Sequence, residues 1–341
     1  MSNTKTILIT GGAGFIGSNF VPYFLETHAN YKVVNFDKLT YAGDLKNLSE
    51  VENNPRYVFI KGDICDRAHV EKVFSEHNVQ GVIHFAAESH VDNSITGPDT
   101  FIQTNIQGTF VMIDVARKFW MKSPFTYKEE HVGARFHHIS TDEVYGTLGA
   151  EGLFTEKTPY APNSPYSAAK ASSDLIVRSY HHTYGMSTVT TNCSNNYGPK
   201  QHDEKLIPTI IRKALKAEAI PIYGDGKNVR DWLYVLDHCR GIDLAYHKGA
   251  DGETYNIGGR NERTNLQIVE SICNILNEYR PRSSGRYQDL ITFVADRPGH
   301  DRRYAIDATK IEEELGWRAQ ENFESGIVKC VCWYLDRLLL S

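Results

Sequence analysis

The 341-residue sequence has few cysteines and no recognisable set of metal ligands. The six cysteines are scattered without a CxxC pair, and the 14 histidines show no metal-ligand spacing, so neither a disulfide framework nor a metal site is indicated. Long apolar runs are also absent, and the first residues lack the charged and apolar regions of a signal peptide. We therefore expect a cytoplasmic protein with buried, reduced thiols, no bound metal and no membrane association.

An excess of positive charge is absent as well. Lys and Arg total 37 and Asp and Glu total 42, which leaves a net charge of −5. Nonspecific nucleic-acid binding needs a positive surface, so this balance argues against a nucleic-acid partner. The apolar share of 41% and the charged share of 23% are typical of globular proteins and exclude a disordered chain. The length fits two domains, or one large domain with a smaller lobe.

The first half of the sequence alternates short β-branched segments with longer helical ones. The segments that predict strands are 6–10, 32–37, 57–61, 81–85 and 136–140, and those that predict helices are 15–28, 68–76 and 100–118. Strands separated by helices indicate βαβ units. The alternation therefore predicts an α/β fold with a doubly wound (Rossmann) parallel sheet covered by helices on both faces.

After about Asn192 the pattern becomes mixed. Helices are predicted at 207–217, 265–278 and 323–339, and short strands at 221–223 and 232–235. We expect residues 1–192 to form a nucleotide-binding domain and residues 193–341 a smaller mixed α/β lobe that binds substrate. Segments from about 232–258 are expected to return to the first domain.

A glycine-rich turn follows the first predicted strand. Residues 11–17 read GGAGFIG, a GxxGxxG turn that opens a helix, where the backbone must bend sharply and approach a pyrophosphate. Asp37 ends the second predicted strand, where a carboxylate binds the adenosine ribose hydroxyls and repels a 2′-phosphate, so NAD is favoured over NADP. Asp63, after the third strand, is placed either to meet the adenine or merely to form a turn.

Tyr166 and Lys170 are four residues apart, which on a helix puts both side chains on one face. Lowering the pKa of a tyrosine from about 10 toward 7 takes about 4 kcal/mol, which a cation at about 4 Å supplies in a medium of effective dielectric about 20. Desolvation opposes this change, so Lys170 and a positive nicotinamide ring are both expected to be needed. Without the nucleotide motif upstream, a chance pair on an amphipathic helix would explain the spacing equally well.

Two neighbouring acids, Asp142 and Glu143, follow the strand predicted at 136–140. Ligands of open α/β sheets bind beyond the carboxyl ends of strands, so these acids and Thr141 stand where chemistry is expected. Two carboxylates in one pocket cannot both ionise cheaply, and we expect one to stay protonated as an acid while the other acts as a base. Alternatively, Thr141 or Asp142 only caps a turn. If both acids reach one substrate, the strand must end by Thr141, because adjacent strand residues face opposite sides.

Together these motifs resemble the extended short-chain dehydrogenase/reductase family, and within it the enzymes that dehydrate nucleotide sugars. The matching stretches span nearly the whole chain: 10–19, 37–43, 84–93, 141–146, 166–171, 192–199, 205–208, 223–235, 255–259 and 296–307. The most specific stretch is Thr141-Asp142-Glu143, because the related 4-epimerases lack the acid pair.

The resemblance implies a lyase that converts dTDP-glucose to dTDP-4-keto-6-deoxyglucose for deoxysugar biosynthesis, using tightly bound NAD. Tyr166 would take the proton of the C4 hydroxyl while the C4 hydride passes to NAD, with Thr141 holding that oxygen and Lys170 binding the nicotinamide ribose. Glu143 would then remove the C5 proton while Asp142 protonates the leaving C6 hydroxyl. The hydride would finally return to C6.

The resemblance also implies binding residues. Those for NAD are Gly11, Gly14, Phe15, Ile16, Gly17, Asp37, Lys38, Leu39, Thr40, Asp63, Ile64, Ala86, Ala87, Glu88, Thr104, Tyr166, Lys170 and Asn196. Those for the sugar nucleotide are Ser89, Thr141, Asn195, Lys205, Leu206, Pro221, Tyr223, Arg230, Asn265, Asp296, Arg297 and His300. The two arginines have a direct rationale, since a guanidinium suits diphosphate oxygens, although each could instead form a surface ion pair.

Other interpretations stay open. A 4-epimerase or a nucleotide-sugar decarboxylase shares the fold, the cofactor and the Tyr/Lys pair, and a non-catalytic NAD-binding regulator is a weaker alternative. Residues 200–203 depart from the family pattern and border the sugar-nucleotide site, so the fine substrate preference is where we expect this protein to differ from its family. The resemblance further implies a homodimer formed by the helices that begin near Thr100 and Tyr166.

Overall fold

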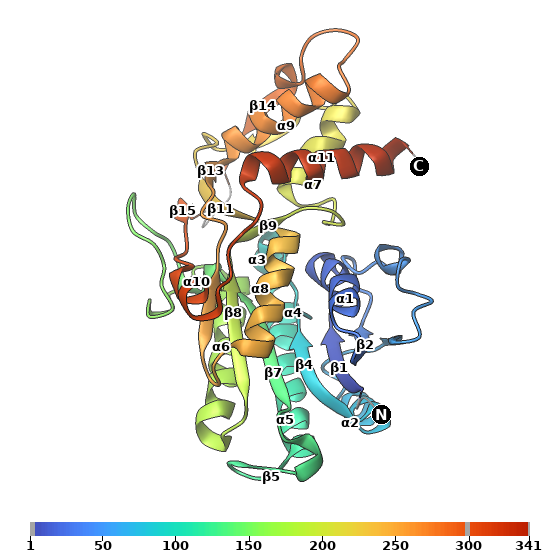
Figure 1. Cartoon of the computed structure of the whole chain (residues 1–341). Helices are drawn as coiled ribbons and strands as arrows, with labels where there is room; N and C mark the ends of the chain where they lie inside the picture. The colour runs from blue at the N-terminus through green and yellow to red at the C-terminus, as the bar shows by residue number, and fades with distance from the viewer. Residues whose placement is uncertain (1–3, 297–300, 340–341) are drawn as a thin grey trace.

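The computed structural model describes residues 4–296 and 301–339. Its centre is a parallel seven-stranded sheet with the order β12-β8-β7-β4-β1-β2-β3 (Figure 1). The strands are β1 (Lys5–Thr10), β2 (Tyr31–Asp37), β3 (Tyr57–Lys61), β4 (Val79–His84), β7 (Arg135–Thr141), β8 (Thr188–Cys193) and β12 (Thr254–Ile257). The strand order reverses between β1 and β4, and this is the point where doubly wound sheets bind ligands. The predicted fold class is therefore confirmed.

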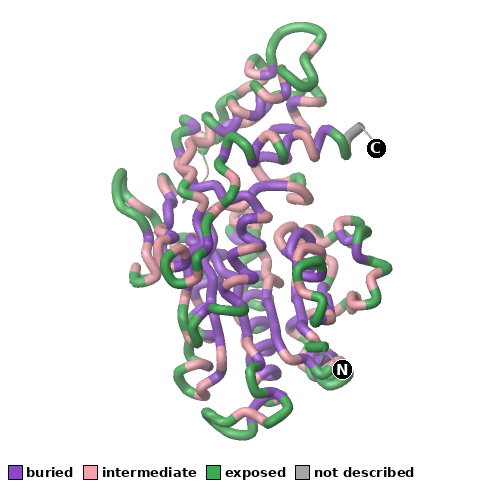
Figure 2. The backbone as a smooth tube through the Cα atoms, viewed as in Figure 1, coloured by how far each residue is buried: buried purple, intermediate pink, exposed green. Residues whose placement is uncertain are grey.

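Helices cover both faces of this sheet, because its strands carry apolar side chains on both sides. Ile7 and Ile9 lie in one core with α1 (Phe15–Thr27) and α8 (Val235–Lys248). Leu8, between them, lies in the second core. That core is shared with α2 (Arg67–His77), α5 (Thr109–Trp120) and α6 (Pro165–Tyr184). Figure 2 shows the central strands buried along their length.

The helix predicted over 100–118 is interrupted. The structure has α4 (Pro98–Phe101), a π-helix η2 (Ile102–Gly108) and then α5. Asn105 in η2 accepts a hydrogen bond from the Glu88 amide (2.8 Å) and donates one to the Glu88 carbonyl (3.0 Å). The wider π-turn thus ties this helix to the loop after β4, as π-turns often do near functional sites.

The later part of the chain builds a smaller group of mixed sheets and helices above the carboxyl edge of the large sheet (Figure 1). Its strands are β9 (Asn195–Tyr197), β10 (Ile220–Tyr223), β11 (Val229–Tyr234), β13 (Glu262–Thr264), β14 (Ile291–Val294) and β15 (Arg303–Tyr304). Its helices α7 (Leu206–Leu215), α9 (Asn265–Tyr279) and α11 (Phe323–Leu339) share one apolar core. In contrast, α8 and β12, from the segment 232–258, belong to the large sheet and its layer.

Shorter elements complete the chain. They are α3 (Val91–Thr96), α10 (Thr309–Leu315), a hairpin of β5 (Met121–Ser123) and β6 (Thr126–Tyr127), and the 3₁₀ helices η1 (Leu45–Leu48), η3 (Glu129–His131), η4 (Asp142–Tyr145) and η5 (Tyr287–Leu290). All six cysteines are free, but Cys65 and Cys332 are only partly buried, so the expectation that every thiol is buried is wrong. Within the described ranges, no helix is both long and apolar enough to cross a membrane.

Candidate active site

A pocket lies at the carboxyl ends of β1, β2, β4 and β7, and it collects nearly all of the predicted cofactor residues. Every predicted NAD-binding residue lines it except Leu39. The Leu39 amide instead donates a hydrogen bond to the Asp37 carboxylate at 2.8 Å, which helps to orient that acid. All five predicted catalytic residues line the same pocket.

The positions in the turn 11–17 require glycine for different structural reasons. Gly11 has a φ of +70°, and a Cβ there would lie 2.7 Å from the Ala86 nitrogen. A Cβ on Gly17 would lie 2.4 Å from the Gly11 carbonyl oxygen, so both positions need glycine for folding. A Cβ on Gly14 would meet nothing closer than 3.4 Å, yet Gly14 lines the pocket and precedes α1, which has no side-chain cap. This open helix start fits the pyrophosphate of a dinucleotide.

Two aspartates shape the far end of the pocket. The Asp37 carboxylate, at the end of β2, accepts hydrogen bonds from the amides of Ala13 (2.9 Å) and Leu39 (2.8 Å), so its position is fixed. Asp63 forms an ion pair with Lys38 at 2.7 Å and accepts a hydrogen bond from the Cys65 amide, so it is also a turn residue. Burial acts to raise the pKa of Asp63, but the bonds from Lys38 and Cys65 outweigh it and hold the pKa below its usual value.

The two neighbouring acids enter the pocket because β7 ends at Thr141, as the sequence argument requires. The 3₁₀ helix η4 begins at Asp142, and the Thr141 hydroxyl accepts a hydrogen bond from the Glu143 amide (3.3 Å). Thr141 is therefore a capping residue as well as a pocket residue. Asp142 is 2% exposed, and burial, together with the nearby charges of Glu143 and Asp231, raises its pKa well above the usual value. This environment favours the protonated form of Asp142 over its carboxylate.

Helix α6 presents Tyr166 and Lys170 to the pocket. Its start is fixed by Pro165 and by a capping box in which the Ser164 and Ser167 side chains each accept the other's amide (3.1 and 3.0 Å). Burial, and then the charge of Glu143, raise the pKa of Tyr166 well above 10. Desolvation therefore dominates in the chain alone, which agrees with the expectation that Lys170 and the nicotinamide ring are both needed to lower this pKa.

Lys170 is instead held by a buried network that the sequence reasoning missed. Its ammonium donates to the Ile139 carbonyl oxygen (2.7 Å) and lies 3.5 Å from His138 Nε2. Asp174, one turn further along α6, accepts hydrogen bonds from the hydroxyls of Ser140 (2.9 Å) and Tyr160 (3.0 Å). Burial raises the pKa of Asp174 to about 6, although the charge of Lys170 acts against this. The spacing of four residues between Lys170 and Asp174 could have indicated from the sequence that both side chains lie on the same face of the helix.

The predicted sugar-nucleotide residues divide into two groups. Ser89, Thr141, Asn195 and Lys205 line the pocket. Six others lie outside its lining: Leu206, Pro221, Tyr223, Arg230, Asn265 and Asp296. Arg297 and His300 lie outside the described residues.

Arg230, one of the predicted substrate residues outside the pocket lining, is held by backbone carbonyl groups. Its guanidinium donates to the carbonyl oxygens of Val229 and Asp301 (both 2.8 Å) and lies 4.3 Å from the centre of the Tyr304 ring. Arg230 is 6% exposed, which does not fit the surface ion pair considered as the alternative, and its predicted contact with the sugar nucleotide stays a prediction. Arg230 anchors the backbone of the 301–302 segment to β11.

The atypical segment 200–203 contributes Gln201 and His202 to the pocket lining. Gln201 donates to the Asn196 carbonyl oxygen (3.0 Å), and the His202 ring meets Tyr41 edge-on with centroids 5.5 Å apart. Glu204, next to them, also lines the pocket. The residues that depart from the family pattern thus face the ligand space.

A doubly wound sheet, a glycine-rich turn, an anchored aspartate at the end of β2 and a Tyr/Lys pair in one pocket define an enzyme of the short-chain dehydrogenase/reductase class. The family model described as GDP-mannose 4,6 dehydratase matches residues 8–330. A dTDP-glucose 4,6-dehydratase of Xanthomonas campestris is 56% identical over 332 residues, covering 97% of this chain and 93% of that protein.

Solved structures agree. The dTDP-glucose 4,6-dehydratase of Streptomyces venezuelae, crystallised with NAD, is 43% identical and superposes with a TM-score of 0.89 over 98% of both chains. The one from Bacillus anthracis, in complex with NAD, is 46% identical, with a TM-score of 0.85 over 97% of both chains. This chain therefore belongs to the dTDP-glucose 4,6-dehydratase family, and the predicted resemblance is confirmed. It is an enzyme of that family.

Proposed function

We propose that this protein dehydrates dTDP-glucose to dTDP-4-keto-6-deoxyglucose with the help of bound NAD. The observation that carries the proposal is the acid pair. Asp142, whose pKa is raised by burial, and its neighbour Glu143 line the same pocket as Tyr166 and Lys170. A 4-epimerase or a simple dehydrogenase eliminates no water, so it has no need of such an acid pair beside the redox site. The relatives named above, two of them crystallised with NAD, support the same substrate and cofactor.

NAD fits the residues present. The uncapped start of α1 at Gly14 would take the pyrophosphate, and the anchored Asp37 carboxylate would take the adenosine ribose hydroxyls. Glu88 and Thr104 line the same pocket from the loop after β4 and from η2. When bound, NAD supplies a reversible acceptor for the C4 hydride, which is returned to C6, so no external reductant is consumed.

The residues of this chain would divide the proton transfers among them. Tyr166 removes the proton of the C4 hydroxyl, and the Thr141 hydroxyl, which hydrogen-bonds to Tyr166 and holds down its pKa, shares that oxygen. Because burial raises the pKa of Tyr166, ionisation needs the added positive charge of Lys170 and of the oxidised cofactor. The 4-keto group then makes the C5 proton acidic enough for the Glu143 carboxylate, while Asp142 protonates the departing C6 hydroxyl. When the hydride is returned to C6, Glu143 would give a proton back to C5, which completes the product.

The direct test is mass spectrometry of dTDP-glucose incubated in heavy water with the protein and no added NADH. We expect a product lighter by one water that carries solvent deuterium at C5. Unchanged mass with an inverted C4 centre would assign the protein to the 4-epimerases, and loss of carbon dioxide from a uronic substrate would assign it to the decarboxylases. Purified protein without any dinucleotide-dependent turnover would favour a regulator.

We also propose that the protein is a cytoplasmic homodimer. The exposed apolar side chains Ile102 (50%) on η2 and Leu175 (58%) on α6 lie on the two helices that the resemblance implies for pairing, and the six free thiols suit a reducing compartment. Replacing Leu175 by Glu should turn a dimer into a monomer in sedimentation velocity at micromolar concentration, while Leu153→Glu, an equally apolar exposed control (42%), should not. A wild-type monomer would contradict the proposed dimer, and fractionation with a secreted marker would contradict the location.

A further inference from the structure

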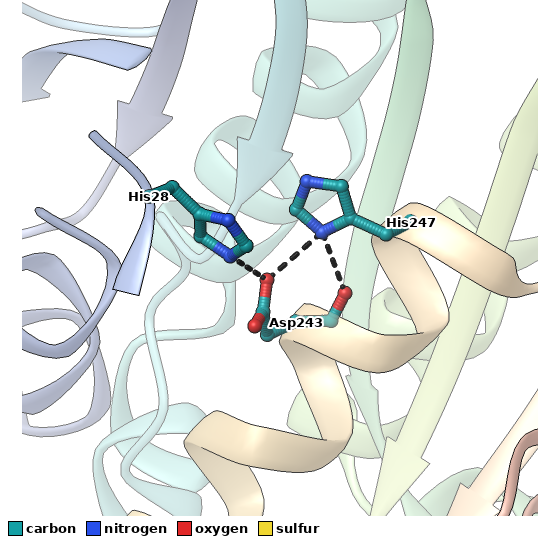
Figure 3. Close-up of side chains that lie close together, drawn as sticks. All are labelled: His28, Asp243 and His247. Atoms are coloured by element: carbon teal, nitrogen blue, oxygen red, sulfur yellow. Dashed lines mark hydrogen bonds and ion pairs between the residues drawn. The ribbon is translucent and has the colours of Figure 1, made fainter. Parts of the chain in front are cut away.

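Two histidines and an aspartate meet on the face of the sheet that is covered by α1 and α8. His28 follows the C-terminus of α1, whereas Asp243 and His247 are one turn apart on α8 (Figure 3). None of the three lines the active-site pocket. The cluster therefore has no part in the proposed dehydration.

The potential ligand atoms converge on one point. Asp243 Oδ1 lies 2.8 Å from His28 Nε2 and 2.9 Å from His247 Nδ1 (Figure 3). All three ligand atoms lie within 4.8 Å of one another. Ligand atoms around a tetrahedral zinc ion, each at about 2.0–2.2 Å from it, are separated by roughly 3.3 Å, so small side-chain rotations would open the space for the ion. Two imidazoles and one carboxylate are a common zinc donor set.

Outer hydrogen bonds orient two of these ligands. The Tyr23 hydroxyl donates to Asp243 Oδ2 at 3.0 Å, on the oxygen that the histidines do not use. The Tyr31 hydroxyl lies 3.3 Å from His247 Nε2, on the side of the ring opposite to Nδ1. Metal-binding carboxylates and imidazoles characteristically have such partners on their other polar atoms, which fix the ring and the carboxylate for the ion.

Access to the cluster is also suitable. The side chains of His28 and His247 are 21% and 27% exposed, whereas that of Asp243 is 9% exposed. An ion could thus enter from solvent and keep a water molecule as its fourth ligand.

We propose that His28, Asp243 and His247 form a binding site for a divalent transition-metal ion, with zinc as the best fit. The ion would tie the end of α1, the helix that begins at the glycine-rich turn, to α8, which is more than two hundred residues away in the chain. The expectation of no bound metal came from sequence spacing, which cannot bring His28 beside the other two ligands.

The test uses the full-length protein after treatment with a chelator. Titration with Co²⁺ should give one equivalent of tight binding with the visible absorption of a tetrahedral ion, and Zn²⁺ should displace it. His28→Gln and His247→Gln should each weaken binding by about 100-fold, and Tyr23→Phe by about 10-fold, because loss of an outer partner typically costs 10–100-fold. His182→Gln, which removes an exposed histidine from α6, should bind as the wild type does.

Several outcomes would overturn the proposal. One is wild-type protein that takes up no stoichiometric Co²⁺, which would make the cluster a plain hydrogen-bonded network. Another is equal affinity in wild type and His247→Gln, measured on variants whose circular dichroism is unchanged. Asp243→Asn, which is nearly isosteric, provides a third ligand variant if either histidine variant fails to fold, and it should also bind at least 10-fold more weakly. Zinc should raise the melting temperature of the wild type but not of Asp243→Asn.

Discussion

Two buried carboxyl groups lie near the Tyr166 and Lys170 pair, and their surroundings differ. Asp174, which does not line the pocket, accepts hydrogen bonds from the hydroxyls of Ser140 and Tyr160. Its Oδ1 lies 3.1 Å from His138 Nε2. Asp142, inside the pocket, has one long contact of 3.4 Å with the Thr141 hydroxyl, and its Oδ2 has no partner within the described part of the chain.

The difference separates a structural acid from a reactive one. Burial raises the pKa of both groups, and within the described residues each has one oxygen without a hydrogen-bond partner. The other oxygen of Asp174 accepts two hydrogen bonds outside the pocket, whereas Asp142 lines the pocket. A buried polar atom without a partner costs stability, so its presence at Asp142 is best explained by a ligand that completes the site. We infer that Asp174 positions Lys170, whereas Asp142 transfers a proton.

The largest expected effect is on turnover. Asp142→Asn keeps the size of the side chain but removes its acidic proton, and we expect the rate of water loss to fall about 100- to 10,000-fold. Bound NAD, measured by absorbance after denaturation, should not change, because Asp142 is assigned to the substrate. A loss below 10-fold would remove Asp142 from the chemistry.

The next effect is on stability. Asp174→Ala leaves the buried Ser140 and Tyr160 hydroxyls without their acceptor, and we expect the free energy of unfolding in urea to fall by about 2–5 kcal/mol. Asp142→Asn, measured in the same way, should lose nothing, because it removes an unsatisfied buried acid. Equal destabilisation by the two variants would erase the proposed contrast between these acids.

The pH dependence of stability should show the same contrast. Asp174 has a pKa of about 6 in the folded chain against 3.8 as its ordinary value, so unfolding releases its proton in this range. Its contribution is therefore fully present below pH 4 and is lost as the pH rises to about 6, a change of about 3 kcal/mol. The difference between the urea midpoints of wild type and Asp174→Asn should change over this window. A pH-independent difference would contradict the assignment.

The smallest expected effects distinguish Gly14, which is assigned to cofactor binding, from Gly17, which is needed for folding. Gly14→Ala adds a methyl group that lies 3.4 Å from the Gly11 carbonyl oxygen, at a residue that lines the pocket, so we expect about 10-fold weaker NAD binding with little change in melting temperature. Gly17→Ala places its Cβ 2.4 Å from a backbone oxygen and should instead lower stability by about 1–3 kcal/mol. Calorimetric titration and thermal melts of both variants would show whether the two roles are distinct.

The parts that the sequence could predict are those that depend on local structure. The glycine-rich turn and Asp37 follow directly from strand, turn and helix, and Tyr166 and Lys170 follow from helical spacing. Arg230 could not be placed in this way, because its partners are backbone carbonyls about 70 residues further along. The π-turn at 102–108 likewise involves a tertiary contact, between Asn105 and Glu88, and the partners of Asp174 come from β7 and from the loop that carries Tyr160.

The protonation state of Asp142 tests the central claim most directly. Infrared difference spectra of wild type minus Asp142→Asn at pH 7 should contain the carbonyl stretch of a neutral carboxylic acid, shifted in heavy water. A difference spectrum that shows only carboxylate bands would mean that Asp142 is ionised in the folded protein, and it could not then donate the proton that releases water.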